Sequence, residues 1–147
     1  MKKPLPPTYV LLSIVIMVAL HYIAPVAMIL AFPWRFWGLL PLAAGIALNI
    51  AADRAFKRRA TTVKPFERST TRLTDGVFRW SRNPMYLGMV LSVAGIALLL
   101  GSLSPWLLVA ILVFLLQRNF ITVEERMLEG SFGAAFIDYK KRVRRWF

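Results

Sequence analysis

Two clusters of polar residues, separated by two apolar segments, contain the residue types that could do chemistry. The first is the run Arg82-Asn83-Pro84-Met85-Tyr86-Leu87-Gly88, and the second is the adjacent pair Glu124-Glu125. The run opens one apolar segment and the pair closes the next, with only a short turn between these segments. A helical hairpin would therefore return both clusters to the same side of a membrane, where they could face each other and bind a charged ligand.

The two glutamates are adjacent, so on a helix their side chains point about 100° apart and cannot serve one small target equally. One of them could meet a cationic group of a ligand while the other pairs with Arg82, Arg118 or Arg126. The alternative from the charge pattern alone is a solvated, salt-bridged helix start. A nearby arginine would keep a carboxylate at this site ionised.

The first cluster has the features of a capped helix start. Pro84 suits the first turn of a helix, where its missing N–H costs nothing, and Asn83 before it is a favourable cap. Tyr86 and Gly88 follow within that turn, which leaves backbone N–H groups and a glycine-sized gap through which a ligand could approach. As spacing alone, the pattern indicates only a helix start.

Apolar segments of membrane-spanning length must position these clusters. The 147-residue chain is 58% hydrophobic, which exceeds the roughly 45–50% that is usual for soluble domains, and it has room for one domain, residues 1–147. A hydrocarbon core of about 30 Å needs about 20 helical residues. The predicted spans are residues 9–32, with a kink at Pro25, and then 36–55, 85–103 and 106–120. We therefore expect an all-α integral membrane bundle of about four helices.

Charge asymmetry predicts the orientation of this bundle. The formal net charge is +12, and the basic residues lie in the amino-terminal lead, the connection 56–84 and the tail 121–147. By the positive-inside rule these regions, and hence both termini, are cytoplasmic. Anionic lipid headgroups are the partner that this charge suggests, rather than nucleic acid. The predicted location is a bacterial inner membrane, where a homodimer could complete the pocket of so small a bundle.

The tail is expected to form an amphipathic cytoplasmic helix. Its apolar residues recur at spacings of three and four, which is typical of a helix with one apolar stripe: Leu128, Phe132, Ala135, Phe136, Tyr139 and Val143. Basic residues cluster near its end. A helix with this pattern lies on the membrane face or packs under the bundle.

Further polar residues lie inside the predicted spans. His21 is either functional, since ionisable groups in membranes usually face the bundle interior, or a neutral imidazole that is hydrogen-bonded to a neighbouring helix. Gly45, Asn49 and Asp53 share one helix face, which either packs closely through the glycine or faces a cofactor. The chain has no cysteine, and a single histidine without a carboxylate cluster predicts no protein-bound metal.

Together the two clusters resemble the superfamily of isoprenylcysteine carboxyl methyltransferases and phospholipid methyltransferases. These are integral membrane enzymes that use S-adenosylmethionine. The resemblance covers about residues 36–145 and rests on the run from Arg82 to Gly88 with the downstream pattern Glu124-Glu125-x-x-Leu128-x-x-x-Phe132-Gly133-x-x-Phe136-x-x-Tyr139-x-x-x-Val143-x-Arg145. Either half alone is a weak signal, whereas both halves at this separation are specific.

The resemblance implies which residues line the S-adenosylmethionine pocket: Arg82, Asn83, Pro84, Tyr86, Gly88, Glu124 and Glu125. Carboxyl methyltransferases often have histidine where this chain has Asn83, which is more like the phospholipid enzymes. The phospholipid enzymes also have a Gly-x-Gly in the preceding span, of which only Gly45 matches. Arg118 is similar to an arginine near the reacting groups, and Arg118 and Glu125 are the predicted catalytic residues.

The resemblance therefore implies an S-adenosylmethionine-dependent methyltransferase that acts on a lipophilic acceptor at the cytoplasmic face. If the acceptor is an isoprenylcysteine-like carboxylate, Arg118 could orient it, and if it is a lipid amine, one glutamate could stabilise its cation. Methyl transfer mainly requires alignment of the reacting atoms and exclusion of water. Three alternatives stay open, namely a sterol-reductase-like membrane oxidoreductase, a small four-span transporter and a non-catalytic scaffold. Transport is disfavoured because the acidic residues lie at helix ends and not near mid-span.

Overall fold

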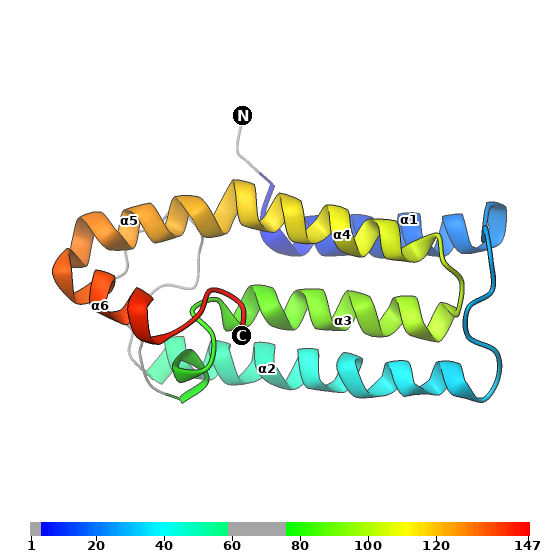
Figure 1. The fold of residues 1–147 in the computed structure, drawn as a ribbon, viewed down its shortest axis with the longest axis horizontal. Helices are drawn as coiled ribbons and strands as arrows, with labels where there is room; N and C mark the ends of the chain where they lie inside the picture. The colour runs from blue at the N-terminus through cyan, green and yellow to red at the C-terminus, as the bar shows by residue number, and fades with distance from the viewer. Residues whose placement is uncertain (1–3, 59–75) are drawn as a thin grey trace.

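The computed structural model describes residues 4–58 and 76–147, which form a bundle of long helices (Figure 1). In chain order the elements are α1 (Pro6–Ile23), the 3-10 turn η1 (Trp34–Gly38), α2 (Leu39–Arg58), η2 (Gly76–Arg79), α3 (Pro84–Leu100), α4 (Pro105–Leu116), the π-helical turn η3 (Gln117–Ile121), α5 (Thr122–Phe132) and α6 (Ala134–Arg142). No strand occurs in these two ranges. The predicted all-α bundle is confirmed, while most of the connection 56–84 lies outside the described residues.

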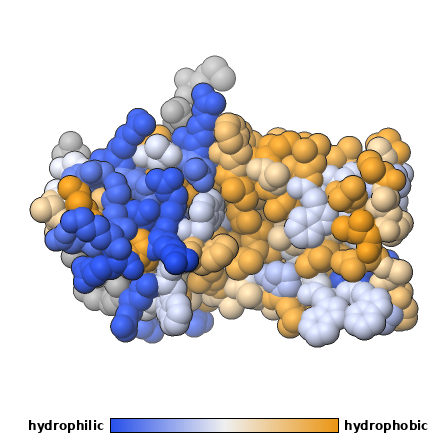
Figure 2. Space-filling model, viewed as in Figure 1, coloured by the Kyte–Doolittle hydropathy of each residue, from blue (hydrophilic) through white to orange (hydrophobic). Residues whose placement is uncertain are grey.

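Three helical stretches are long and apolar enough to cross a membrane, namely Pro6–Ile23, Trp34–Arg58 and Pro105–Phe132. Helix α3 is also apolar but shorter, at 17 residues. Figure 2 shows apolar side chains over the half of the molecule that holds most of α1–α4, and hydrophilic side chains over the end that holds α5 and α6. The chain is therefore an integral membrane protein with one polar end.

The first apolar segment forms a shorter helix than the predicted span. Helix α1 ends at Ile23, and Pro25 follows this end instead of kinking the helix. The residue before a proline is disfavoured in the helical region, and Ala24 accordingly leaves it, with φ −146° and ψ 69°. Backbone hydrogen bonds then tie residues 27–30 to the turn between α3 and α4 at residues 101–103.

His21 lies at the end of α1 that is remote from the polar clusters. Its Nδ1 atom lies 2.7 Å from Ser102 Oγ, in the turn between α3 and α4. This hydrogen bond joins two segments that are far apart in the sequence. Of the two interpretations of His21, the structure supports the one in which the imidazole is bonded to a neighbouring part of the bundle.

Helices α2 and α3 pack along a seam of glycines. A Cβ atom added to Gly45 would lie 2.5 Å from the Gly88 carbonyl oxygen, and one added to Gly95 would lie 2.6 Å from the Leu42 backbone nitrogen. Such distances leave no room for a side chain at either crossing point. Small residues at helix contacts let backbones approach closely in membrane bundles, so the glycines set the spacing of these two helices.

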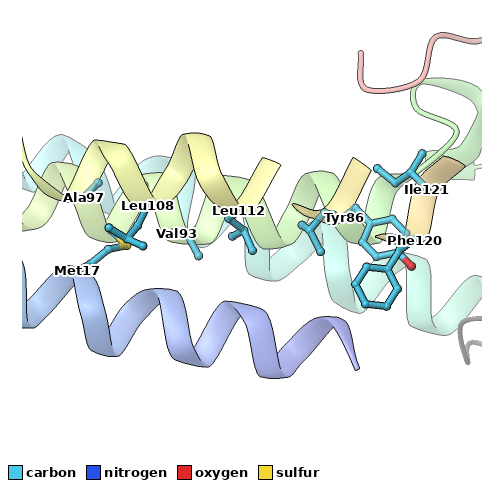
Figure 3. Close-up of a cluster of buried hydrophobic side chains, with 9 residues drawn as sticks. Met17, Tyr86, Val93, Ala97, Leu108, Leu112, Phe120 and Ile121 are labelled. Carbon is cyan, nitrogen blue, oxygen red and sulfur yellow. The ribbon is translucent and has the colours of Figure 1, made fainter. Parts of the chain in front are cut away.

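A buried apolar core joins α3 to α1 and α4 (Figure 3). Its side chains are those of Met17, Tyr86, Val93, Ala97, Leu108, Leu112, Leu116, Phe120 and Ile121. Tyr86 belongs to the first turn of α3, and Phe120 and Ile121 belong to η3, so the core reaches the polar end. Helix α3 is therefore the central helix of the bundle.

The tail forms two helices where the sequence predicted one. Helix α5 continues α4 through η3, and Gly133, with φ +52°, separates α5 from α6. Glycine reaches that positive φ readily because it has no Cβ. Helix α6 then turns back below α5 (Figure 1). Ala135 is exposed, but the rest of the predicted stripe packs together as one cluster: Leu128, Phe132, Phe136, Tyr139 and Val143.

Candidate functional site

The hairpin of α3 and α4 brings the two predicted clusters together at the polar end. The Tyr86 hydroxyl donates a hydrogen bond to Glu124 Oε1 over 2.6 Å. Arg82 Nη2 lies 3.3 Å from Glu125 Oε1. Both links join the start of α3 to the first turn of α5, which confirms that the hairpin makes the clusters face each other.

The start of α3 differs in one respect from the predicted cap. Pro84 is the first residue of the helix, as predicted. The Asn83 side chain does not cap this helix, and its Nδ2 instead donates to the Arg145 carbonyl over 3.0 Å. Its backbone N–H donates to Ser81 Oγ over 3.1 Å. Asn83 is thus bound to the end of the chain, because that segment offers its side chain a carbonyl acceptor.

A pocket of about 260 Å³ lies beside these residues. It is lined by five of the predicted site residues: Arg82, Asn83, Pro84, Tyr86 and Glu124. Its other lining residues are apolar and were not predicted: Leu5, Pro6, Pro7, Phe56, Phe78, Met85 and Met89. The spacing of Met85 and Met89 places them on one face of a helix and could have suggested these two. The others come from segments that no spacing rule connects.

Glu124 is the acidic group of the pocket. It lies in α5, at the polar end of the molecule (Figure 2), where α5 extends the apolar helix α4 beyond its membrane-spanning part. Burial raises the pKa of its carboxyl group to about 7, although the hydrogen bond from Tyr86 acts in the opposite direction. The carboxyl group therefore changes its charge near neutral pH, and a cationic ligand would favour the ionised form.

Arg82 supplies the opposite charge. Its side chain is 10% exposed, and its Nε and Nη1 atoms are buried with no hydrogen-bond partner among the described residues. A buried donor without a partner is unfavourable, so these two nitrogen atoms are suited to donate to an anionic group of a ligand. The pocket thus combines an acceptor for a cation with donors for an anion.

Glu125 is buried and does not line the pocket. Arg145 binds its carboxylate through two hydrogen bonds, from Nη2 to Oε2 over 2.6 Å and from Nε to Oε1 over 3.2 Å. Arg82 approaches the same carboxylate from the start of α3. The two glutamates therefore differ as the sequence suggested, since Glu124 lies at the pocket and Glu125 pairs with arginine.

Three other predicted site residues lie outside the lining of this pocket. Gly45 and Gly88 face each other in the seam between α2 and α3, where Asn49 Nδ2 donates to the Gly45 carbonyl over 3.0 Å. Of the two interpretations of Gly45, the structure supports close helix packing. Arg118 is exposed, and its guanidinium carbon lies 6.0 Å from the centre of the Phe114 ring.

Comparison with known proteins identifies the family. A model of the phospholipid methyltransferase family matches residues 34–135, which is more than half of the chain. The chain belongs to the phospholipid methyltransferase family. The matched residues include α2 to α5, and with them both charged groups of the pocket. This result confirms the superfamily resemblance of the two clusters.

Curated relatives named protein-S-isoprenylcysteine O-methyltransferase align with part of this family member. The Saccharomyces cerevisiae protein is 45% identical over 71 residues, which are 46% of this chain and 28% of that protein. The Mus musculus protein is 32% identical over 108 residues, which are 72% of this chain and 38% of that protein. The chain thus spans less than two fifths of the length of these two methyltransferases.

A shorter relative is covered almost completely. An uncharacterized Haemophilus influenzae protein is 39% identical over 62 residues, which are 42% of this chain and 98% of that protein. No solved structure matches the chain significantly.

Proposed function

We propose that this membrane protein is an S-adenosylmethionine-dependent methyltransferase that acts on a lipophilic acceptor at the cytoplasmic face. The observation that carries the proposal is the pair of opposite charges in one mostly apolar pocket. The negative member is the Glu124 carboxylate, and the positive member is Arg82 with its unpaired donors. Membership of the phospholipid methyltransferase family supports the same chemistry.

The charged residues of the pocket fit the amino-acid end of S-adenosylmethionine, which carries an ammonium, a sulfonium and a carboxylate. When bound, this cofactor supplies an activated methyl group. Arg82 would donate from Nε and Nη1 to the carboxylate, and Glu124 would face one of the cations. Phe56, Phe78 and Met89 would provide apolar walls. Small-molecule sites measure about 300–1,000 Å³, so a pocket of about 260 Å³ would enclose only part of the cofactor.

The chain would promote methyl transfer by binding, alignment and exclusion of water. An in-line displacement requires that the reacting atoms lie in one line, and such positioning can lower a barrier by about 7–11 kcal/mol. Tyr86 orients the Glu124 carboxyl group through its hydrogen bond. With a pKa of about 7, Glu124 could also accept a proton from an amine acceptor.

The proposed acceptor is an isoprenylcysteine-like carboxylate or a lipid amine. The Saccharomyces cerevisiae and Mus musculus relatives are named for the first kind, and the family is named for phospholipids. Leu5, Pro6 and Pro7 form part of the apolar lining near the start of α1, and burial of a lipid chain against such a surface is favourable. Arg118 lies outside this pocket, so we assign it to the acceptor and not to the cofactor.

The proposed orientation places the polar end, with both termini, at the cytoplasmic side of a bacterial inner membrane. Its support is the gathering of basic residues at this end. The exposed side chains of Lys141, Arg142 and Arg144 would contact anionic lipid headgroups there.

Calorimetric titration of the detergent-purified protein tests the proposed function. We expect micromolar binding of S-adenosylmethionine and S-adenosylhomocysteine but no binding of NADPH, the cofactor that a reductase would need. Glu124→Gln keeps the shape of the side chain and removes its charge, so it should weaken S-adenosylmethionine binding more than about tenfold. Glu129→Gln in the same helix is the control, because Glu129 pairs with Lys140 and does not line the pocket.

Two results would contradict the proposed function. Binding of NADPH alone would indicate a membrane reductase. Binding of none of the three ligands would favour a transporter or a scaffold.

A further inference from the structure

The last residues of the chain cross the start of α3 (Figure 1). We call residues 143–146 the C-terminal strap. The backbone N–H of Arg82 donates to the Arg144 carbonyl over 3.0 Å, and Trp146 Nε1 donates to Gln117 Oε1 over 3.3 Å. The strap is thus bound to both arms of the hairpin that carries the two clusters.

Arg145 is the residue through which the strap reaches the site. Its carbonyl oxygen accepts hydrogen bonds from Asn83 Nδ2 over 3.0 Å and from Ser81 Oγ over 3.3 Å. Its guanidinium binds both carboxylate oxygens of Glu125. One residue therefore links the segment before α3 to the first turn of α5, although it does not line the pocket.

Glu125 is the shared partner of Arg145 and Arg82. Arg145 makes the two-pronged contact with both carboxylate oxygens, and Arg82 shares Oε1 through Nη2 alone. The Nε and Nη1 atoms of Arg82, which lines the pocket, have no hydrogen-bond partner among the described residues. Without Arg145, the buried carboxylate would have one arginine left, and the favoured geometry of such a pair is a fork with two parallel hydrogen bonds. Arg82 would then turn Nε or Nη1, which are unpaired in the wild-type chain, toward Glu125.

We propose that Arg145 is a positioning residue that keeps the free donors of Arg82 available for the anionic group of the ligand. The proposal rests on the proposed function, in which that group is the carboxylate of S-adenosylmethionine. Arg145 acts through Glu125 and Arg82 without touching the ligand. Arg145 is the last residue of the downstream sequence pattern, and the pattern alone implied no role for it.

Two ligands distinguish this role from a merely structural one. S-adenosylhomocysteine carries the carboxylate, whereas 5′-methylthioadenosine has the same adenosine and sulfur but no amino-acid end. In calorimetric titrations of the full chain, Arg145→Gln should weaken the first ligand about tenfold and the second less than about twofold. Arg144→Gln is the control, because it removes the same charge from a neighbouring, exposed side chain and should change neither affinity.

Arg145→Lys keeps the charge but loses the fork, so it should weaken S-adenosylhomocysteine alone by only about threefold. If Arg145→Gln does not fold, the affinities of Arg145→Lys for the two ligands provide the test. Equal weakening of both ligands, or no weakening of either, would overturn the role of Arg145 and leave the proposed function intact. A wild-type chain that binds neither ligand would overturn the proposed function, and this inference with it.

Discussion

The side of α3 that meets α2 serves helix packing, whereas the side that meets α5 belongs to the candidate site. Toward α2, Gly88 lies so close to Gly45 that no Cβ fits between the backbones. Toward α5, Tyr86 of α3 and Arg82, which precedes this helix, meet the two glutamates through a hydrogen bond and an ion pair. Tyr86 and Gly88 are neighbours in one motif, yet only the first lines the pocket. A motif can therefore contain residues that bind a ligand and residues that only position the helix.

Filling the glycine seam should have the largest effect. In Gly45→Leu the new Cβ would lie 2.5 Å from the Gly88 carbonyl oxygen and from Ser92 Oγ, so α2 and α3 would have to move apart. Overpacking of this kind lowers the free energy of unfolding by roughly 1–3 kcal/mol, which thermal unfolding in detergent would measure. An unfolding temperature equal to that of the wild type would contradict the seam.

The matched control for the seam is Gly130→Ala in α5. No atom lies within 4 Å of a Cβ added at Gly130. Alanine is the better helix former by about 1 kcal/mol, so this variant should be as stable as the wild type or more stable.

At the side of α3 that meets α5, a substitution should weaken ligand binding. Arg82→Ala removes the free guanidinium donors and should weaken S-adenosylmethionine binding more than about tenfold in a calorimetric titration. Glu125 would keep its 2.6 Å contact with Arg145, so the unfolding temperature should fall less than in Gly45→Leu. Arg79→Ala is the control, since Arg79 is exposed and outside the pocket. Equal affinities of the two variants would contradict the assignment of Arg82.

The affinity for S-adenosylmethionine should rise with pH. The pKa of Glu124 is raised to about 7, so at lower pH a cation can bind well only if the carboxyl group first loses its proton. Titrations between pH 6 and pH 8 should show a gain of roughly tenfold, with a plateau at higher pH. Glu124→Gln cannot titrate and should abolish the slope. A flat profile for the wild type would contradict the binding of a cationic group by a Glu124 carboxyl whose pKa is raised to about 7.

Arg118→Gln should have the smallest effect on cofactor binding. Its guanidinium lies over the Phe114 ring and outside the pocket, so the affinity for S-adenosylhomocysteine should stay within about twofold of the wild type. Turnover tests the predicted catalytic role separately. A lower kcat with unchanged affinity would assign Arg118 to the acceptor, whereas a tenfold loss of affinity would place it at the cofactor.

The sequence by itself determined the class of the fold and the meeting of the two clusters. Apolar segments of spanning length, joined by a short turn, must form a hairpin in lipid, because a helix satisfies its own backbone hydrogen bonds. That rule is enough to bring Arg82 and Tyr86 to the same end of the bundle as the two adjacent glutamates. Pro84 likewise begins α3 for a purely local reason, since the first turn needs no N–H from it.

The tertiary structure decided which side chains form the pocket and which support it. The π-helical turn η3, where Thr122 Oγ1 donates to the Gln117 carbonyl over 2.8 Å, joins α4 to α5. Glu124 and not Glu125 lines the pocket, and the adjacency of the two residues in the sequence left that choice open. The pairing of Gly45 with Gly88 and the binding of Asn83 by Arg145 join residues that no helical spacing relates. Local rules act over a few positions along the chain, whereas these contacts exist only after separate helices have packed.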